Sequence, residues 1–163
     1  MKIIGEGYTV KCENIIIRKF ESMDSSKLIE IIKRNLIEIN SKDYAKEIIN
    51  GMCNLFTPER MIENAKKRDI YVAEFDGELI GTASLEDNVV YGVFVDVNYH
   101  RCGVGRKLMS IIEYKAKENS VNLIQIPSSI TSQNFYYELG YKYVKEVETP
   151  DSGKCIIVEK QLF

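Results

Sequence analysis

The sequence lacks long apolar runs and clustered metal ligands. A transmembrane helix needs roughly 20 consecutive apolar residues, and no stretch of this chain approaches that length, so we expect no membrane partner. Structural zinc requires closely spaced cysteines and histidines. This chain has 1 histidine and 4 cysteines, and no two cysteines form a C-x-x-C pair. We therefore expect no bound metal. The cysteines are Cys12, Cys53, Cys102 and Cys155.

An excess of positive charge and an export signal are also missing. The formal net charge is −2, whereas nucleic-acid binding by counterion release needs a concentrated basic face. We therefore expect no nucleic-acid partner. The segment Met1–Gly7 is too short and too polar for a secretory signal. Scattered thiols in such a chain are typical of a reducing compartment, which predicts a cytoplasmic protein.

The length and composition that are present fit one globular unit. The chain has 163 residues, of which 45% are hydrophobic and 28% charged, and we expect a single domain spanning 1–163. Helical spacing of apolar residues predicts helices at 24–39, 42–52, 57–68, from 104 onward and at 131–139. Apolar β-branched runs predict strands at 15–20, 69–75, 78–85, 89–95, 122–127, 141–144 and 155–158. The fold class is therefore α/β.

Local signals mark where several of these elements begin and end. Asp24 and Thr57-Pro58 are typical of helix starts, and Gly140 is typical of a helix end. Asp76-Gly77 between two apolar runs predicts a β-hairpin. The run 89–95 is almost wholly hydrophobic, which predicts burial on both faces. It should form a parallel crossover with the strand at 122–127.

The segment from Val93 to Arg106 is the strongest functional signal. An apolar strand ends, a polar turn follows, and Gly103 and Gly105 bracket Val104 at the start of a helix. The amides of a helix start favour negative charge, and glycine lets the backbone approach it closely. This pattern predicts a phosphate site. It lacks the Lys-Ser/Thr pair of a Walker loop and the third glycine of a dinucleotide fingerprint.

Two motifs resemble those of the GCN5-related N-acetyltransferase (GNAT) family. The V-x-V strand followed by R-x-G-x-G-R resembles the acetyl-coenzyme A motif, and Phe135–Tyr141 resembles the family's F-Y-x-x-L-G-F/Y signature. The resemblance runs from about Ile15 to the end of the chain. It implies a single-domain GNAT-like fold with a mixed, mostly antiparallel central sheet flanked by helices. It also implies a V-shaped splay between the strands at 89–95 and 122–127.

The resemblance implies acetyl-coenzyme A (acetyl-CoA) as cosubstrate. The backbone of Val93, Phe94 and Val95 would bind the pantetheine arm, and the amides from Arg101 to Arg106 would bind the pyrophosphate. Further cofactor contacts are expected from His100, Ser129 and Asn134. The alternative interpretation of His100 is a turn histidine that faces water. The predicted cofactor-binding residues are therefore Val93, Phe94, Val95, His100, Arg101, Cys102, Gly103, Val104, Gly105, Arg106, Ser129 and Asn134.

The implied activity is N-acetyltransferase, by direct transfer to the primary amine of a small molecule or a peptide. The Val95 amide would lie near the thioester carbonyl, and Tyr136 matches the family's usual general acid. Some family members place a basic glutamate where this chain has Val89. Glu86 is the nearest candidate base, and its alternative interpretation is a solvated turn. The acceptor would bind between residues 24 and 66 and the last hairpin, in a region that contains Glu38, Asp43, Tyr44, Glu47 and Phe56.

Val89 also keeps a second hypothesis open, in which the chain is a catalytically silent acyl-CoA-binding sensor or interaction module. A nucleotide-phosphate binder is a third. The resemblance is compatible with a homodimer. The sequence does not specify the acceptor or whether the acyl chain is acetyl or longer.

Overall fold

The computed structural model describes residues 2–4, 8–10 and 12–163. The prediction that Met1–Gly7 is not a secretory signal concerns a segment that lies partly outside the described residues. The helices are α1 (Ser25–Glu38), α2 (Lys46–Leu55), α3 (Pro58–Asn64), α4 (Val104–Glu118) and α5 (Gln133–Glu138). The strands are β1 (Lys2–Ile4), β2 (Tyr8–Val10), β3 (Ile16–Lys19), β4 (Asp69–Phe75), β5 (Glu78–Glu86), β6 (Val89–Val95), β7 (Leu123–Ser129), β8 (Lys142–Thr149) and β9 (Gly153–Gln161). Four short 3₁₀ turns are η1 (Ser22–Asp24), η2 (Asn40–Lys42), η3 (Val97–Tyr99) and η4 (Ile130–Ser132).

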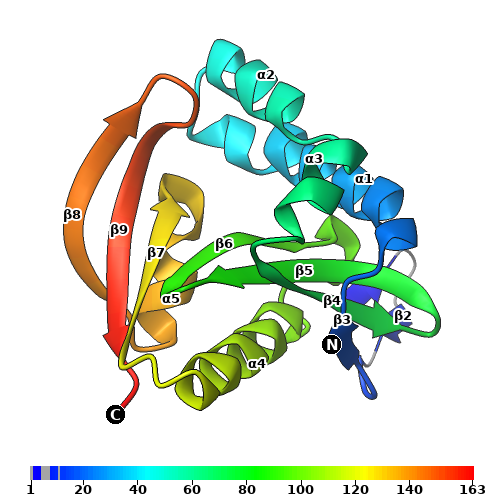
Figure 1. Ribbon diagram of the computed structural model, residues 1–163. Coiled ribbons are helices and arrows are strands. Elements are labelled where there is room, and N and C mark those ends of the chain that lie inside the picture. The colour runs from blue at the N-terminus through cyan, green and yellow to red at the C-terminus, as the bar shows by residue number, and fades with distance from the viewer. Residues whose placement is uncertain (1, 5–7, 11) are drawn as a thin grey trace.

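Seven strands form the central sheet in the order β3-β4-β5-β6-β7-β9-β8, and β1 and β2 form a separate two-stranded sheet. Neighbouring strands of the central sheet are antiparallel except β6 and β7, which are parallel. This confirms the mixed, mostly antiparallel α/β fold. Figure 1 shows that β7, β9 and β8 turn away from the direction of β4, β5 and β6.

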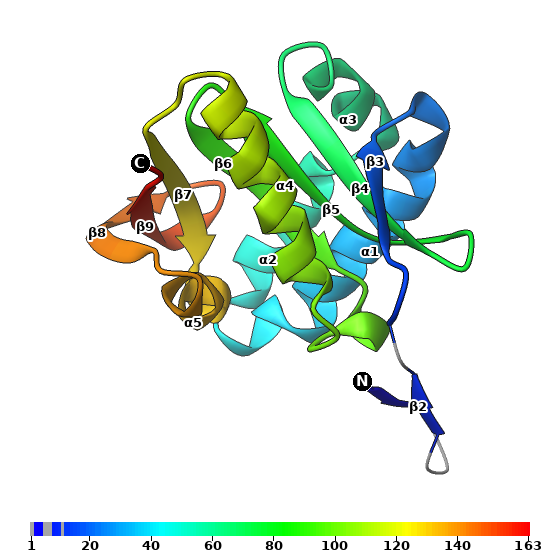
Figure 2. The same ribbon diagram turned by 90° about the horizontal axis from the view of Figure 1, so that it is seen from below.

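Helices cover both faces of the sheet. Figure 2 shows α4 across one face, with α1, α2 and α3 on the other. Leu108 and Ile112 of α4 pack in one core cluster with Ala83 and Val90 of the sheet. The apolar side of α1 forms a second cluster with α2, against which Phe94 of β6 packs. The sheet therefore separates a main core from two smaller clusters beneath α1, α2 and α3.

Most of the predicted start and stop signals are confirmed. The Thr57 hydroxyl accepts a hydrogen bond from the Arg60 amide at 3.2 Å and caps α3. Asp76 and Gly77 both have positive φ, 50° and 77°, as the predicted two-residue hairpin requires. Gly140, at φ 91°, follows the end of α5. These three positions behave as their residue types dictate.

Two expectations about helix ends were wrong. Asp24 precedes α1 but makes no side-chain cap. Its carboxylate instead points back along the chain, where it accepts two hydrogen bonds from Arg18, at 2.8 and 2.9 Å, and one from the Glu21 amide at 2.8 Å, which closes a capping box on η1. The contact with Arg18 lowers the pKa of Asp24. Helix α3 ends at Asn64 and not near Arg68, and residues 65–67 form a turn.

The predicted splay between β6 and β7 is confirmed. The two strands share one register pair, Val89 with Gln125, whereas β7 pairs with β9 along its whole length. Across the described chain, no strand pairs with the β7-facing edge of β6 beyond this point. The strand is for this reason less buried than its sequence suggested. Within 89–95 only Val90 is buried, which corrects the expectation of burial on both faces.

Candidate functional site

The open edge of β6 presents backbone groups of Val95. The Asp96 amide donates to the Ile80 carbonyl of β5 at 2.7 Å. Backbone groups of successive strand residues point to alternate sides, so the N–H and C=O of Val95 point away from β5, toward the splay. Phe94 differs, because its backbone faces β5 and its ring packs edge-on against Phe56 at 5.8 Å.

The Val95 carbonyl already has two protein donors. Asn35 of α1 donates from Nδ2 to this oxygen at 2.7 Å, and Nε2 of His100 lies 2.8 Å from it. The same ring nitrogen lies 3.0 Å from Oδ1 of Asn35. His100 therefore directs Nε2 inward to the strand end, and only its Nδ1 remains for the phosphate contact that the sequence predicts.

The start of α4 has the features of an anion site. Gly103 is the N-cap, with a left-handed φ of 83°, and has no side chain to satisfy the first amides of the helix. A Cβ at this position would have nothing within 4 Å, so the backbone faces open space. Arg101 and Arg106 are exposed on either side, and Cys102 is half-buried. Amides, helix dipole and two guanidinium groups all favour an anion here.

Helix α5 contacts the start of α4 through Phe135, the residue before Tyr136. A Cβ on Gly105 would lie 3.0 Å from the Phe135 ring, so α4 and α5 touch where glycine is required. Tyr136 is 4% exposed, and its ring packs against Phe135 and Tyr141 at centroid distances of 5.0 and 5.9 Å. Burial raises the pKa of the Tyr136 phenol well above its ordinary value. The phenol therefore holds its proton at neutral pH.

The other two predicted cofactor contacts lie at the start of α5. The Ser129 hydroxyl accepts from the Ser132 amide at 3.2 Å and donates to the Ser132 hydroxyl at 3.0 Å. It therefore caps η4. Asn134 is exposed. Their contact with a cofactor stays a prediction.

Glu86 lies at the closed end of the splay. It pairs with Val89 across β5 and β6, so six residues of β6 separate that register position from Val95, roughly 20 Å along a strand. Its carboxylate accepts from Nε of Arg68 at 2.5 Å, and this hydrogen bond lowers the pKa of Glu86. Arg68 also lies over the Tyr91 ring, 4.2 Å from its centroid. The structure therefore does not bring Glu86 together with Val95.

The connection between α1 and α2 reaches the far half of the sheet. Tyr44 donates from its hydroxyl to the Lys154 carbonyl at 2.6 Å and accepts from the Ile130 amide at 2.9 Å. The Thr131 hydroxyl donates to the Asp43 carboxylate at 2.8 Å. Figure 1 shows the start of α2 beside the β8–β9 turn. The connection between these helices is thus tied to the β7–β9 side of the splay, and Asn35 of α1 supplies the contact with β6 on the other side.

The remaining acceptor candidates divide between the surface and the second core. Glu38 pairs with Arg34 at 2.9 Å, and Glu47 is exposed. Phe56 packs against the second core cluster. The structure therefore brings Tyr44 and Phe56 to the side of α1 and α2 that faces the sheet. The carboxylates of Glu38 and Glu47 lie on the exposed side.

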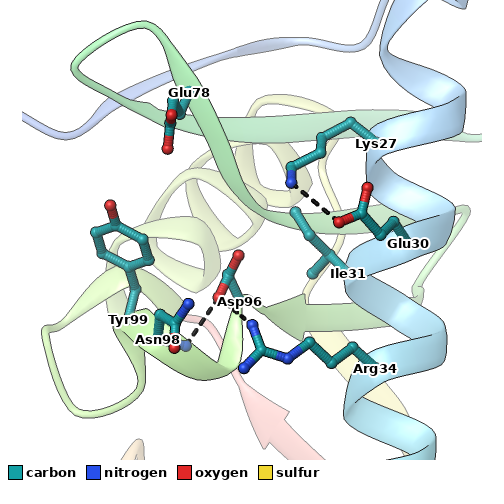
Figure 3. Close-up of a pocket in the computed structure, with 8 residues that line it drawn as sticks. All are labelled: Lys27, Glu30, Ile31, Arg34, Glu78, Asp96, Asn98 and Tyr99. Carbon is teal, nitrogen blue, oxygen red and sulfur yellow. Dashed lines mark hydrogen bonds and ion pairs between the residues drawn. The ribbon is translucent and has the colours of Figure 1, made fainter. Parts of the chain in front are cut away.

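A polar cavity of about 310 Å³ lies between α1 and the turn after β6. Figure 3 shows Arg34 reaching toward Asp96, with Tyr99 and Glu78 opposite. Its lining comprises Lys27, Glu30, Ile31, Arg34, Glu78, Asp96, Asn98 and Tyr99, and none of them is a predicted cofactor contact. Within the described residues, no three histidine, cysteine, aspartate or glutamate side chains could hold a metal. No described helix has the length and apolarity to cross a membrane.

Sequence reasoning missed Asn35 as a site residue. The available signal was a polar residue within the apolar stripe of α1, which contains Leu28, Ile32 and Leu36. Such a residue is buried at a cost unless it is hydrogen-bonded. Its partner is the end of β6, 60 residues further along the chain, and only the folded structure brings the two together.

Comparison with known proteins agrees with this geometry. Residues 32–157 match the family described as acetyltransferase (GNAT) domain. An uncharacterized N-acetyltransferase, YafP of Escherichia coli strain K12, is 26% identical over 133 residues, covering 82% of this chain and 85% of YafP. A GCN5-related N-acetyltransferase from Rhodopseudomonas palustris has a similar structure, with a TM-score of 0.85 at 17% identity, covering 95% of this chain and 99% of that one.

A second similar structure is the PaiA N-acetyltransferase from Thermoplasma acidophilum, solved in complex with coenzyme A. Its TM-score is 0.75 at 21% identity, covering 91% of this chain and 99% of that one. The family match spans most of the chain and includes both the glycine-flanked start of α4 and Tyr136. Together with the splayed sheet, it establishes that the chain belongs to the GNAT family of acetyltransferases.

Proposed function

We propose that this protein transfers an acetyl group from acetyl-CoA directly to a primary amine. The observation that carries the proposal is the open edge of β6, which leads into the glycine-flanked start of α4. An extended pantetheine arm fits an unpaired strand edge, and a pyrophosphate fits a helix start. The PaiA structure, which holds coenzyme A, supports the same assignment.

The chain's own groups would bind and orient the cosubstrate. Val93 would bind the pantetheine arm through its backbone, Val95 would contact the thioester through its N–H, and residues Arg101 to Arg106 would hold the pyrophosphate. The Val95 N–H would stabilise the oxyanion that forms when the amine attacks the thioester carbon. One preorganised donor of this kind is commonly worth about 3–4 kcal/mol of transition-state stabilisation.

Proton movements complete the reaction. The amine attacks the thioester carbon and the C–N bond forms. When the C–S bond breaks, the leaving thiolate takes a proton from Tyr136. Water takes the proton that the amine loses, and solvent returns a proton to the Tyr136 phenolate. Burial keeps the Tyr136 phenol protonated at neutral pH, and the raised pKa also makes it a weaker acid than a free phenol. We assign the base to water and no longer to Glu86, since Arg68 holds that carboxylate at the closed end of the splay. We further propose a cytoplasmic location, as the scattered thiols of the sequence suggest.

A silent acyl-CoA binder is the second candidate, because Val89 cannot accept a proton. A thiol-release assay with acetyl-CoA and a panel of small and peptide amines separates the two. The proposal predicts amine-dependent release of coenzyme A and a matching acetylated product by mass spectrometry. Tight binding of acetyl-CoA without turnover on any amine would instead support the silent binder.

A further inference from the structure

The end of β6 is held by Asn35, a buried side chain of α1, which is one of the helices expected to bind the acceptor. We infer that Asn35 and His100 are positioning residues. They fix the peptide between Val95 and Asp96 at the open edge of β6, and this aims the N–H of Val95 at the thioester. This inference rests on the proposed function. It concerns a contact between segments 60 and 65 residues apart in the chain.

The polar atoms of the Asn35 amide are fully engaged. Asn35 is 5% exposed. Its Nδ2 donates to the Ile31 carbonyl at 2.9 Å and to the Val95 carbonyl at 2.7 Å. Its Oδ1 is then the acceptor that faces His100 at 3.0 Å. The orientation of the amide is therefore set by its three partners.

These partners also assign the protonation of His100. Nε2 of the ring lies 2.8 Å from the Val95 oxygen and 3.0 Å from Oδ1 of Asn35. Both are acceptors, so Nε2 carries the proton. His100 is thus a donor to the strand end, and the Val95 carbonyl receives two donors on the side where β6 has no strand partner within the described chain.

The effect is to lock one peptide at both ends. The Asp96 amide donates to Ile80 of β5, and the Val95 carbonyl is held from the opposite side. Arg34, next to Asn35, also lies 3.8 Å from the Asp96 carboxylate. With its carbonyl occupied, Val95 offers its N–H as the group at this edge, and its direction is fixed by the locked peptide that follows it.

Steady-state kinetics of alanine variants test this assignment. Asn35→Ala is expected to lower kcat about tenfold or more and to change KM for acetyl-CoA less than about threefold, because the donor matters most in the transition state. His100→Ala should act in the same direction, and the double variant should be little worse than Asn35→Ala. His100→Gln, which keeps a side-chain donor, should recover most of kcat.

Ser25→Ala is the matched control. Ser25 is also buried on α1, at 5% exposed, and also donates to a backbone carbonyl, that of Ser22. Its loss should lower the melting temperature without lowering kcat. Equal kcat losses in Ser25→Ala and Asn35→Ala, or strictly additive losses in the double variant, would overturn a positioning role.

NMR spectra separate this inference from the proposed function. Long-range ¹H–¹⁵N spectra of the ligand-free protein should show His100 with its proton on Nε2, and a proton on Nδ1 alone would contradict the clamp. If the wild type shows no turnover, the proposed function fails. The Val95 amide resonance then decides, since it should move in Asn35→Ala and stay in place in Ser25→Ala. An unmoved resonance in Asn35→Ala overturns the inference.

Discussion

Tyr136 combines the side chain expected of a general acid with an almost fully buried position. Burial raises the pKa of its phenol from an ordinary 10.0. A general acid acts only while it holds its proton, so a raised pKa extends the active range to higher pH. Ionisation of Tyr136 should therefore not limit turnover anywhere below its ordinary pKa.

Tyr136→Phe should lower kcat by about 10²-fold or more, which is typical of removing a general acid, with a smaller effect on KM for acetyl-CoA. The wild-type kcat should show no decline attributable to Tyr136 between pH 7 and 10.0. Tyr137→Phe is the control, because Tyr137 is its neighbour in α5 and 37% exposed. If Tyr136→Phe retains full turnover, another group protonates the thiolate.

The turn between β6 and α4 joins the two ends of the proposed site. Its geometry depends on Gly103, which adopts a left-handed φ and leaves the start of α4 open. Any side chain there is strained by the backbone and projects into the space in front of the first amides. Two side chains of the same size at position 103, one charged and one neutral, therefore differ only in the charge that they place in front of these amides.

Gly103→Glu and Gly103→Gln provide that comparison. Both variants carry the same backbone strain and nearly the same volume, so their difference in coenzyme A affinity reports charge. The glutamate variant should bind coenzyme A about tenfold or more weakly than the glutamine variant, as measured by calorimetry, because like charges repel at short range. Equal affinities would mean that the pyrophosphate lies elsewhere.

The overall arrangement was largely predictable from the chain. The strands of the central sheet and the helices that flank it were located by turn residues such as Asp76-Gly77 and by apolar periodicity. These signals depend only on residues that are close together in the chain. The glycine-flanked helix start and the Phe135–Tyr141 motif indicated the family and, through it, the splay. The N-terminal hairpin of β1 and β2 was not predicted, because its short strands carry no clear periodicity.

Contacts between distant segments were not predictable in the same way. Asp24 has the residue type of a cap for α1, but its carboxylate binds Arg18 of β3 and the Glu21 amide instead. Glu86 has the residue type of a base, but the β5–β6 register places it at the opposite end of β6 from Val95, where it pairs with Arg68. Asn35 contacts Val95 only because α1 crosses the end of β6. In each case the partner is set by packing, which a single sequence does not specify.

The two halves of the sheet are joined at Val89 and Gln125. They are linked again through α1 and the segment after it, since Asn35 contacts β6 and Tyr44 contacts the β7–β9 half. Coenzyme A is proposed to lie in the gap between the two halves. Calorimetric titration of the wild-type protein with coenzyme A, and separately with ATP, tests this assignment most directly. We predict saturable binding of one coenzyme A per chain and much weaker binding of ATP. Tight binding of ATP without measurable affinity for coenzyme A would contradict it.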